Sequence, residues 1–111
     1  MAVTFTRLAT SLIAAATDTY YTVAANTRTR IDNLALTNTD TASRTVSVYL
    51  VASGGSAGAS NIVLQDLSIA PGATVRVKGA IGQVLHTCGT IKAVASVASK
   101  INIYASGVEI T

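Results

Sequence analysis

The chain is poor in the residues that carry out chemistry. Its 111 residues include one His, one Cys, one Pro and no Trp, and Asp and Glu together number five. A single Cys excludes a disulfide within the chain, and one His with one Cys supplies only two of the four ligands of a structural zinc site. The acids lie far apart and lack the spacing of a calcium loop. We therefore predict a protein that is not an enzyme, with no catalytic, metal or cofactor site.

His86 and Cys88 form the one reactive pair of the sequence. On a strand, residues i and i+2 share a face, but their side chains lie about 7 Å apart, too far for a direct hydrogen bond. A zinc site shared between the copies of a symmetric oligomer remains the alternative. We expect instead that Cys88 is a small buried apolar residue and that His86 lies at a strand end.

Charge is also sparse, at 12% of the residues with a formal net charge of +3. Only two pairs of basic residues lie close together, Arg28 with Arg30 and Arg76 with Lys78, and each pair falls on one face of a strand. Nucleic-acid binding calls for a denser basic patch with stacking aromatics, so we expect no nucleic-acid partner. No stretch approaches the roughly 18 apolar residues of a membrane span, so we expect no membrane partner either.

What the chain does contain is apolar residues in period-two alternation. Half of the residues are hydrophobic. In the clearest segment, residues 44–51, Val46, Val48 and Leu50 alternate with polar neighbours, as in a half-buried strand. The spacing of such segments predicts an all-β fold, a single β-sandwich of jelly-roll type with about eight antiparallel strands. The expected strands are residues 3–8, 19–23, 28–38, 44–51, 62–69, 74–78, 90–96 and 100–110.

Turn-forming residues mark the ends of these segments. Pro71-Gly72 has the composition of a tight turn, and the period slips near Asp32-Asn33, where a β-bulge fits. We also expect a bulge at Gly107. The small, polar stretch Ser53–Ser60 predicts a mobile hairpin tip.

We expect one sandwich domain over residues 17–111, preceded by an N-terminal strand or docking arm at residues 1–16. Residues 7–16 have the basic residue and short apolar run of a signal peptide. Thr10 and Ser11 interrupt that run, so we expect this segment to stay in the folded chain.

The mean hydropathy of +0.49 is high for a small domain. It indicates more apolar surface than one core hides, and thus a homo-oligomer. Aromatic residues suit interfaces, and the candidate interface residues are Phe5, Tyr20, Tyr21 and Tyr49. Since Tyr20 and Tyr21 are adjacent, we expect one in the core and the other exposed.

Residues 19–111 resemble a group of small virion structural proteins of tailed bacteriophages. The resemblance rests on the segments Tyr20–Thr27 and Ile31–Asn38, the Pro71-Gly72 turn and the closing segment Ala105–Ile110. It implies location in the virion after assembly in the host cytoplasm. The group's pattern includes no catalytic or ligand residues, so none is carried over.

Two functions follow from this resemblance. The first is a capsid decoration (cement) protein, a homotrimer that binds the major capsid protein or another virion protein and stabilises the head shell. The alternative is a receptor- or carbohydrate-binding module of a tail or fibre. Such a module favours exposed aromatic platforms, and the chain has one Phe, four Tyr and no Trp.

Overall fold

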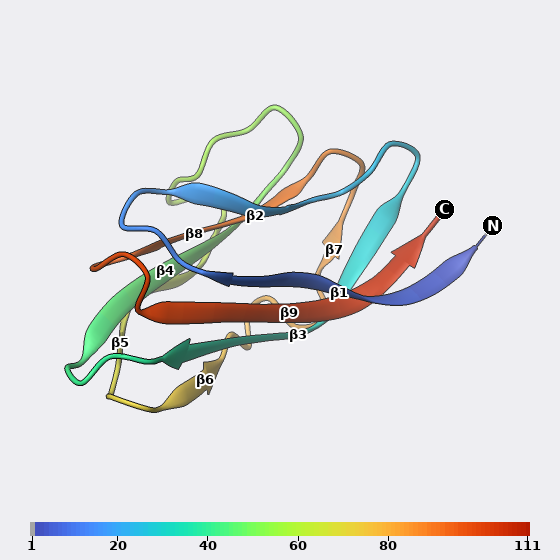
Figure 1. Ribbon diagram of the computed structural model, residues 1–111. Helices are drawn as coiled ribbons and strands as arrows, with labels where there is room; N and C mark the ends of the chain where they lie inside the picture. The colour runs from blue at the N-terminus through green and yellow to red at the C-terminus, as the bar shows by residue number, and fades with distance from the viewer. Residues whose placement is uncertain (1) are drawn as a thin grey trace.

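The alternating segments form two antiparallel sheets that pack face to face (Figure 1). The structure is a computed structural model that describes residues 2–111, and these residues contain nine strands and no helix. The predicted all-β sandwich is therefore confirmed.

One sheet has five strands and the other has four. The five-stranded sheet has the order β1 (Val3–Leu12), β9 (Ile101–Ile110), β3 (Arg28–Asn38) and β6 (Thr74–Arg76), and β7 (Val84–Leu85) also pairs with β3. The four-stranded sheet has the order β2 (Asp18–Thr22), β8 (Thr90–Ala95), β4 (Arg44–Val51) and β5 (Ile62–Ile69).

The strand order is that of a jelly roll. Leaving out the short β7, every connection between consecutive strands of the remaining eight crosses from one sheet to the other, except the β4–β5 hairpin. The first and last strands, β1 and β9, are neighbours in the five-stranded sheet. These eight strands correspond to the eight predicted segments. The ninth, β7, has two residues and lies in the stretch between residues 79 and 85, where the sequence pattern is ambiguous.

The core lies between the sheets and follows the alternation of the central strands. In β8, Ile91, Ala93 and Ala95 are buried, and the intervening residues are half-buried. In β9 the inward series begins at Ile101 and Ile103. β-branched side chains fit this pleated, two-layered interior well. The largest fully buried side chains are Ile13, Ile31, Leu34, Leu36, Ile69, Ile91, Ile101, Ile103, Val23, Val46, Val48 and Val51.

The N-terminal segment is part of the sandwich. β1 pairs with β9 from Val3 to Leu12, and Leu8, Ala9 and Ile13 belong to the core. The segment that we described as a strand or docking arm therefore contains a ten-residue strand at the edge of the five-stranded sheet. Met1 lies outside the described residues.

Two predicted local features are found as expected. The register of β3 against β9 shifts between Ile31 and Asn33, which makes Asp32 the bulged residue. In the Pro71-Gly72 turn, the N–H of Ala73 donates to the carbonyl of Ala70 at 3.1 Å, and Gly72 has a φ of 74°. Gly tolerates this left-handed conformation because it lacks a Cβ.

Gly107 has a different role from the predicted bulge. The pairing of β9 runs without interruption through Gly107, and the bulges lie on its two partners, at Leu8 in β1 and at Asp32 in β3. A Cβ at Gly107 would overlap the carbonyl oxygen of Arg30, and Leu8 lies against the same position. Glycine is needed here because the neighbouring backbone approaches too closely for any side chain.

The tip between β4 and β5 is hydrogen-bonded rather than featureless. The Asn61 amide donates to the Ser56 carbonyl at 2.8 Å and accepts from the Gly58 N–H at 3.0 Å. Gly55 lies close to Val51, whose side chain is buried. Part of the predicted mobile tip thus covers an apolar residue of β4.

We predict that Gly107→Ala destabilises the fold by about 1–3 kcal/mol or more, because a rigid backbone must move to admit the methyl group. Chemical denaturation measures the loss. Gly58→Ala is the matched control, since a Cβ there meets nothing within 4 Å, and it should be nearly neutral. Equal stability of the two variants would contradict this explanation of Gly107.

Candidate interaction surface

The exposed large hydrophobic side chains gather on one face of the molecule. Within the described residues they are Val3, Phe5, Leu12, Val84 and Tyr104. All five belong to strands of the five-stranded sheet. Side chains alternate along a strand, and the positions next to these five, or their partners on the adjacent strand, point into the core. The five side chains therefore point outward. We call the outward side of this sheet the outer face.

Register places several of these residues side by side. Phe5 pairs with Val108 of β9, Val108 pairs with Arg30 of β3, and Arg30 pairs with Val84 of β7. Directly opposed residues of an antiparallel pair share a face, so the four form one row across the sheet. Val108 is buried although it points outward, and Phe5 remains 78% exposed at the end of the row.

The outer face is also basic. Arg28, Arg30 and Arg76 take outward positions on β3 and β6, and Arg7 does so on β1. Arg30 donates through Nε to Asp32 at 2.9 Å, in an ion pair that is largely exposed. A partner for this face would therefore combine apolar contacts with negative charge.

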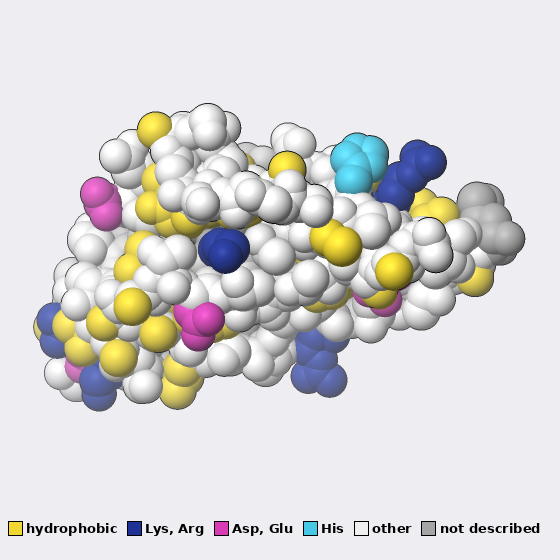
Figure 2. Space-filling model, turned by 90° about the horizontal axis from the view of Figure 1, so that it is seen from above, with side chains coloured by type: hydrophobic (Ala, Val, Ile, Leu, Met, Phe, Trp, Pro, Cys, Tyr) yellow, Lys and Arg dark blue, Asp and Glu magenta, His cyan; other side chains and the backbone are white. Residues whose placement is uncertain are grey.

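The opposite side of the sandwich has a different character. Seen from the side of β2 and β8, single charged side chains are scattered over most of the surface, and basic and acidic side chains lie close together at one end (Figure 2). Tyr49 lies on this side, where β4 pairs it with Lys92 and Ile62, and it is half-buried. Tyr49 and Phe5 therefore lie on opposite sides of the protein and do not form a common interface.

The other two candidate interface residues point inward. A bulge in β2 between Thr19 and Tyr21 leaves Tyr20 as the extra residue, so the two adjacent tyrosines no longer alternate. Both are half-buried and pack against the core. The prediction that one would be exposed is therefore wrong, because a one-residue bulge cannot be seen in the alternation of β2 alone.

Tyr21 links the two sheets through its hydroxyl. The oxygen lies 2.6 Å from Oε2 of Glu109, to which it donates, and 2.7 Å from Oγ1 of Thr29. Burial, followed by the hydrogen bond to Glu109, raises the pKa of Tyr21 to about 12. The tyrosine is thus a protonated donor at neutral pH, which suits a structural link. The Tyr20 hydroxyl accepts the Ala14 N–H at 2.8 Å and fixes the loop before β2.

The remaining acids also serve local structure. Arg44 donates to Asp40 at 2.7 Å, and this hydrogen bond, with a further one from the Thr41 N–H, lowers the pKa of Asp40. Asp66 accepts from the Ser47 hydroxyl, and Asp18 accepts from the Thr19 N–H. No group of three or more His, Cys, Asp and Glu residues in the described chain could hold a metal ion.

Cys88 and His86 both lie at the surface. Figure 2 shows the His at the end of the molecule where Figure 1 places the chain termini. His86 follows β7, as predicted, but Cys88 is exposed rather than buried. Its φ of 64° and the hydrogen bond from the Gly89 N–H to the His86 carbonyl define a tight turn, which turns the thiol away from the core.

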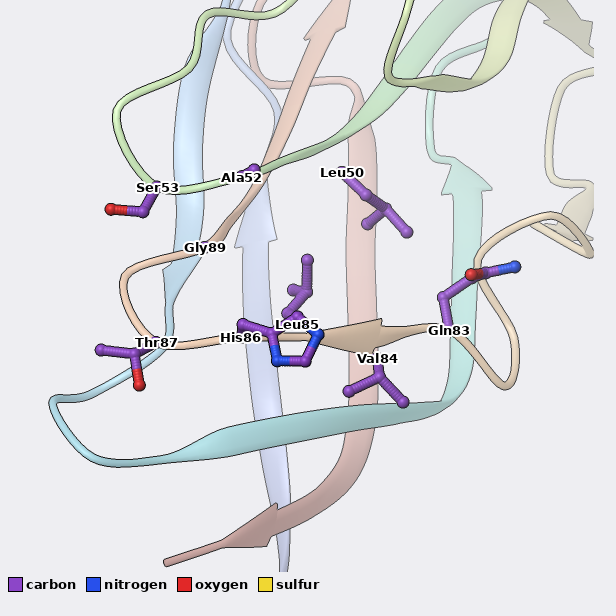
Figure 3. Close-up of a pocket in the computed structure, with 9 residues that line it drawn as sticks. All are labelled: Leu50, Ala52, Ser53, Gln83, Val84, Leu85, His86, Thr87 and Gly89. Carbon is purple, nitrogen blue, oxygen red and sulfur yellow. The ribbon is translucent and has the colours of Figure 1, made fainter.

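A shallow pocket of about 440 Å³ lies beside this turn (Figure 3). Leu50 and Leu85 belong to its apolar lining, and His86 is its one titratable residue. Ala52 and Ser53, at the start of the tip, border it. A second pocket, of about 590 Å³, is lined by Asn26, Thr27, Arg28, Thr87, Ile110 and Thr111. Neither pocket is lined by an Asp or Glu side chain.

No family model matches this chain, and neither curated proteins nor solved structures include a significant match to it. Within residues 2–111 there is also no helix long and apolar enough to cross a membrane.

The Tyr21 link predicts a pH dependence of stability at high pH. Because the folded-state pKa lies above the ordinary value of 10, the contribution of Tyr21 is complete below pH 10 and is lost as the pH rises towards 12. The free energy of unfolding of the wild type should therefore fall more steeply over this window than that of Tyr21→Phe. At neutral pH we expect Tyr21→Phe to cost about 1–2 kcal/mol.

Denaturant unfolding at a series of pH values measures both effects. Tyr49→Phe, on the outside of the other sheet, is the control and should keep the wild-type slope. Parallel pH profiles for the wild type and Tyr21→Phe would contradict the assigned role of Tyr21.

Proposed function

We propose that this chain is a structural component of a bacteriophage particle, most specifically a decoration protein that binds the outside of the head shell. The observation that carries the proposal is the concentration of exposed apolar side chains among arginines on the outer face. Exposed apolar surface of this kind is typical of interaction sites. The resemblance of residues 19–111 to small phage virion proteins is the reason for proposing a phage particle as the assembly that this face binds.

The chemistry of the chain supports a binding role over a catalytic one. Four of the five acids accept hydrogen bonds from neighbouring residues, and Glu109 accepts one from Tyr21. In the proposed role each copy would contact shell subunits, the major capsid protein above all, through the outer face. Many weak contacts then add through multivalency.

A homo-oligomer belongs to this proposal. The resemblance implies a symmetric oligomer. A trimer suits the threefold positions of a shell, and a pair would suit the twofold positions that icosahedral shells also contain. In either form the protein would be located in the virion.

A tail-associated receptor- or carbohydrate-binding module is the second candidate. One observation favours it: the β4–β5 tip borders the pocket at Leu50 and Leu85, so a ligand could contact both. In a decoration protein the same tip would project away from the shell.

Particles of the phage that encodes this chain provide the test of the decoration role. We expect a density map to show copies at the head, in a number that matches capsid symmetry. Tyr104→Glu combined with Arg76→Glu, two outward residues joined through Ala35 in one row, should abolish incorporation. Lys92→Glu, on the other sheet, is the control and should be incorporated normally. Copies found only at the tail would overturn the proposal.

Replacing Ser53–Ser60 with a two-residue Asn-Gly turn separates the two candidate functions. We expect the variant to fold, since loop closure depends only weakly on length, with some loss of stability because Gly55 no longer lies against Val51. A decoration protein should then retain particle stability and normal infection. Loss of adsorption to host cells by correctly folded protein would favour the receptor-binding module.

A further inference from the structure

The edge of the five-stranded sheet at β1 has little of the usual protection of edge strands before its bulge at Leu8. Within the described chain β1 pairs with β9 on one side and with no strand on the other (Figure 1). Its ten residues include one charge, at Arg7, and no Lys, Asp, Glu or Pro. Charges and prolines are the residues with which natural sheets prevent edge-to-edge association.

The open side of β1 offers backbone hydrogen-bonding groups at defined residues. Ala2 and Thr111 exchange N–H to carbonyl hydrogen bonds of 3.3 and 2.9 Å. Since bonded and non-bonded pairs alternate along an antiparallel ladder, Val3, Phe5 and Arg7 direct their N–H and carbonyl groups away from β9. These three residues also have exposed side chains on the outer face.

We propose that two copies of this chain pair through the β1 edge, antiparallel and about a twofold axis at Phe5. In this register Phe5 faces Phe5 of the second copy, and Val3 faces the second copy's Arg7. Each facing pair exchanges two main-chain hydrogen bonds. The result is one continuous sheet across both copies, with the outer faces on the same side. This inference concerns association in solution and goes beyond the particle role.

The side chains suit this register. Phe5 is 78% and Val3 52% exposed in one copy, and pairing covers both. The two Arg7 residues lie four positions apart along the paired strands, about 13 Å, where salt screens their repulsion. Each Arg7 is instead diagonal to the Phe5 ring of the other copy, within reach of a cation–π contact.

The bulge at Leu8 limits the length of the paired segment. Beyond it the register against β9 shifts, and a bulge increases local twist, so the free edge turns away from a straight partner strand. Pairing therefore involves residues 3–7 of each copy. So short an edge contact falls at the small end of specific interfaces, and we expect dissociation in the micromolar range.

Light scattering on the purified full chain tests the pairing. The wild type should be dimeric at high micromolar concentration, and Phe5→Lys should raise the dissociation constant at least about tenfold, because it places two charges at the centre of the paired edge. Phe5 is exposed, so the variant should keep the wild-type circular dichroism. Tyr49→Lys, on the other sheet, is the matched control and should remain dimeric. A monomeric or trimeric wild type, or a dimer unaffected by Phe5→Lys, overturns the proposal.

Cysteine cross-linking tests the register itself and keeps Phe5 in place. In a Cys88→Ser background, Val3→Cys mixed with Arg7→Cys should give a disulfide-linked dimer under mild oxidation, since these positions face each other. Either variant alone should not, because its two cysteines lie about 13 Å apart, beyond the roughly 7 Å that a disulfide spans. Cross-linking of a single variant alone, or none in the mixture, contradicts this register. The Tyr104→Glu and Arg76→Glu variant measures incorporation into particles and leaves β1 unchanged. The proposed pairing through β1 and the proposed decoration role can therefore fail independently of each other.

Discussion

The sandwich depends on the pairing of β9 with β1 on one side and β3 on the other. The last strand of the chain thereby lies between the first and the third, and its inward residues Ile101, Ile103 and Ala105 are fully buried. At Gly107 the Arg30 backbone of β3 and the Leu8 side chain of β1 approach so closely that a side chain has no room. The bulges of β1 and β3 lie beside Gly107, so the twist of both neighbouring strands changes there.

This arrangement also determines which surface the protein presents. Because β1 and β9 are neighbours, Val3, Phe5 and Tyr104 reach the same face although they come from opposite ends of the chain. β3 adds Arg28 and Arg30 to that face. The interior is held by apolar packing and by the Tyr21 link between the sheets, so the outward residues carry little of the stability of the fold. Such residues are free to serve binding.

Local pattern was enough to predict most of the fold. Apolar segments between turn-forming stretches identified residues 28–38, 44–51 and 62–69 as strands, with the bounds that β3, β4 and β5 have in the structure. The slip at Asp32 and the Pro71-Gly72 turn were equally visible, because bulges and turns leave local signs in composition and period. The number and spacing of the strands predicted a sandwich of jelly-roll type, whereas the order of the strands within each sheet came from the tertiary structure.

The sequence by itself thus determined the strands, the turns and the inward residues of the core, since side-chain alternation is a property of each strand alone. Tertiary structure decided the rest. The bulge that turns both Tyr20 and Tyr21 inward is set by pairing with β8, and the turn that exposes Cys88 is set by hydrogen bonds to Val23 and His86. The order of the strands also decides the surface. It places Phe5 in one row with Val84 and leaves Tyr49 on the other side of the sandwich. Neighbours are chosen by contacts between residues far apart in the chain, and the pattern within one strand carries no information about them.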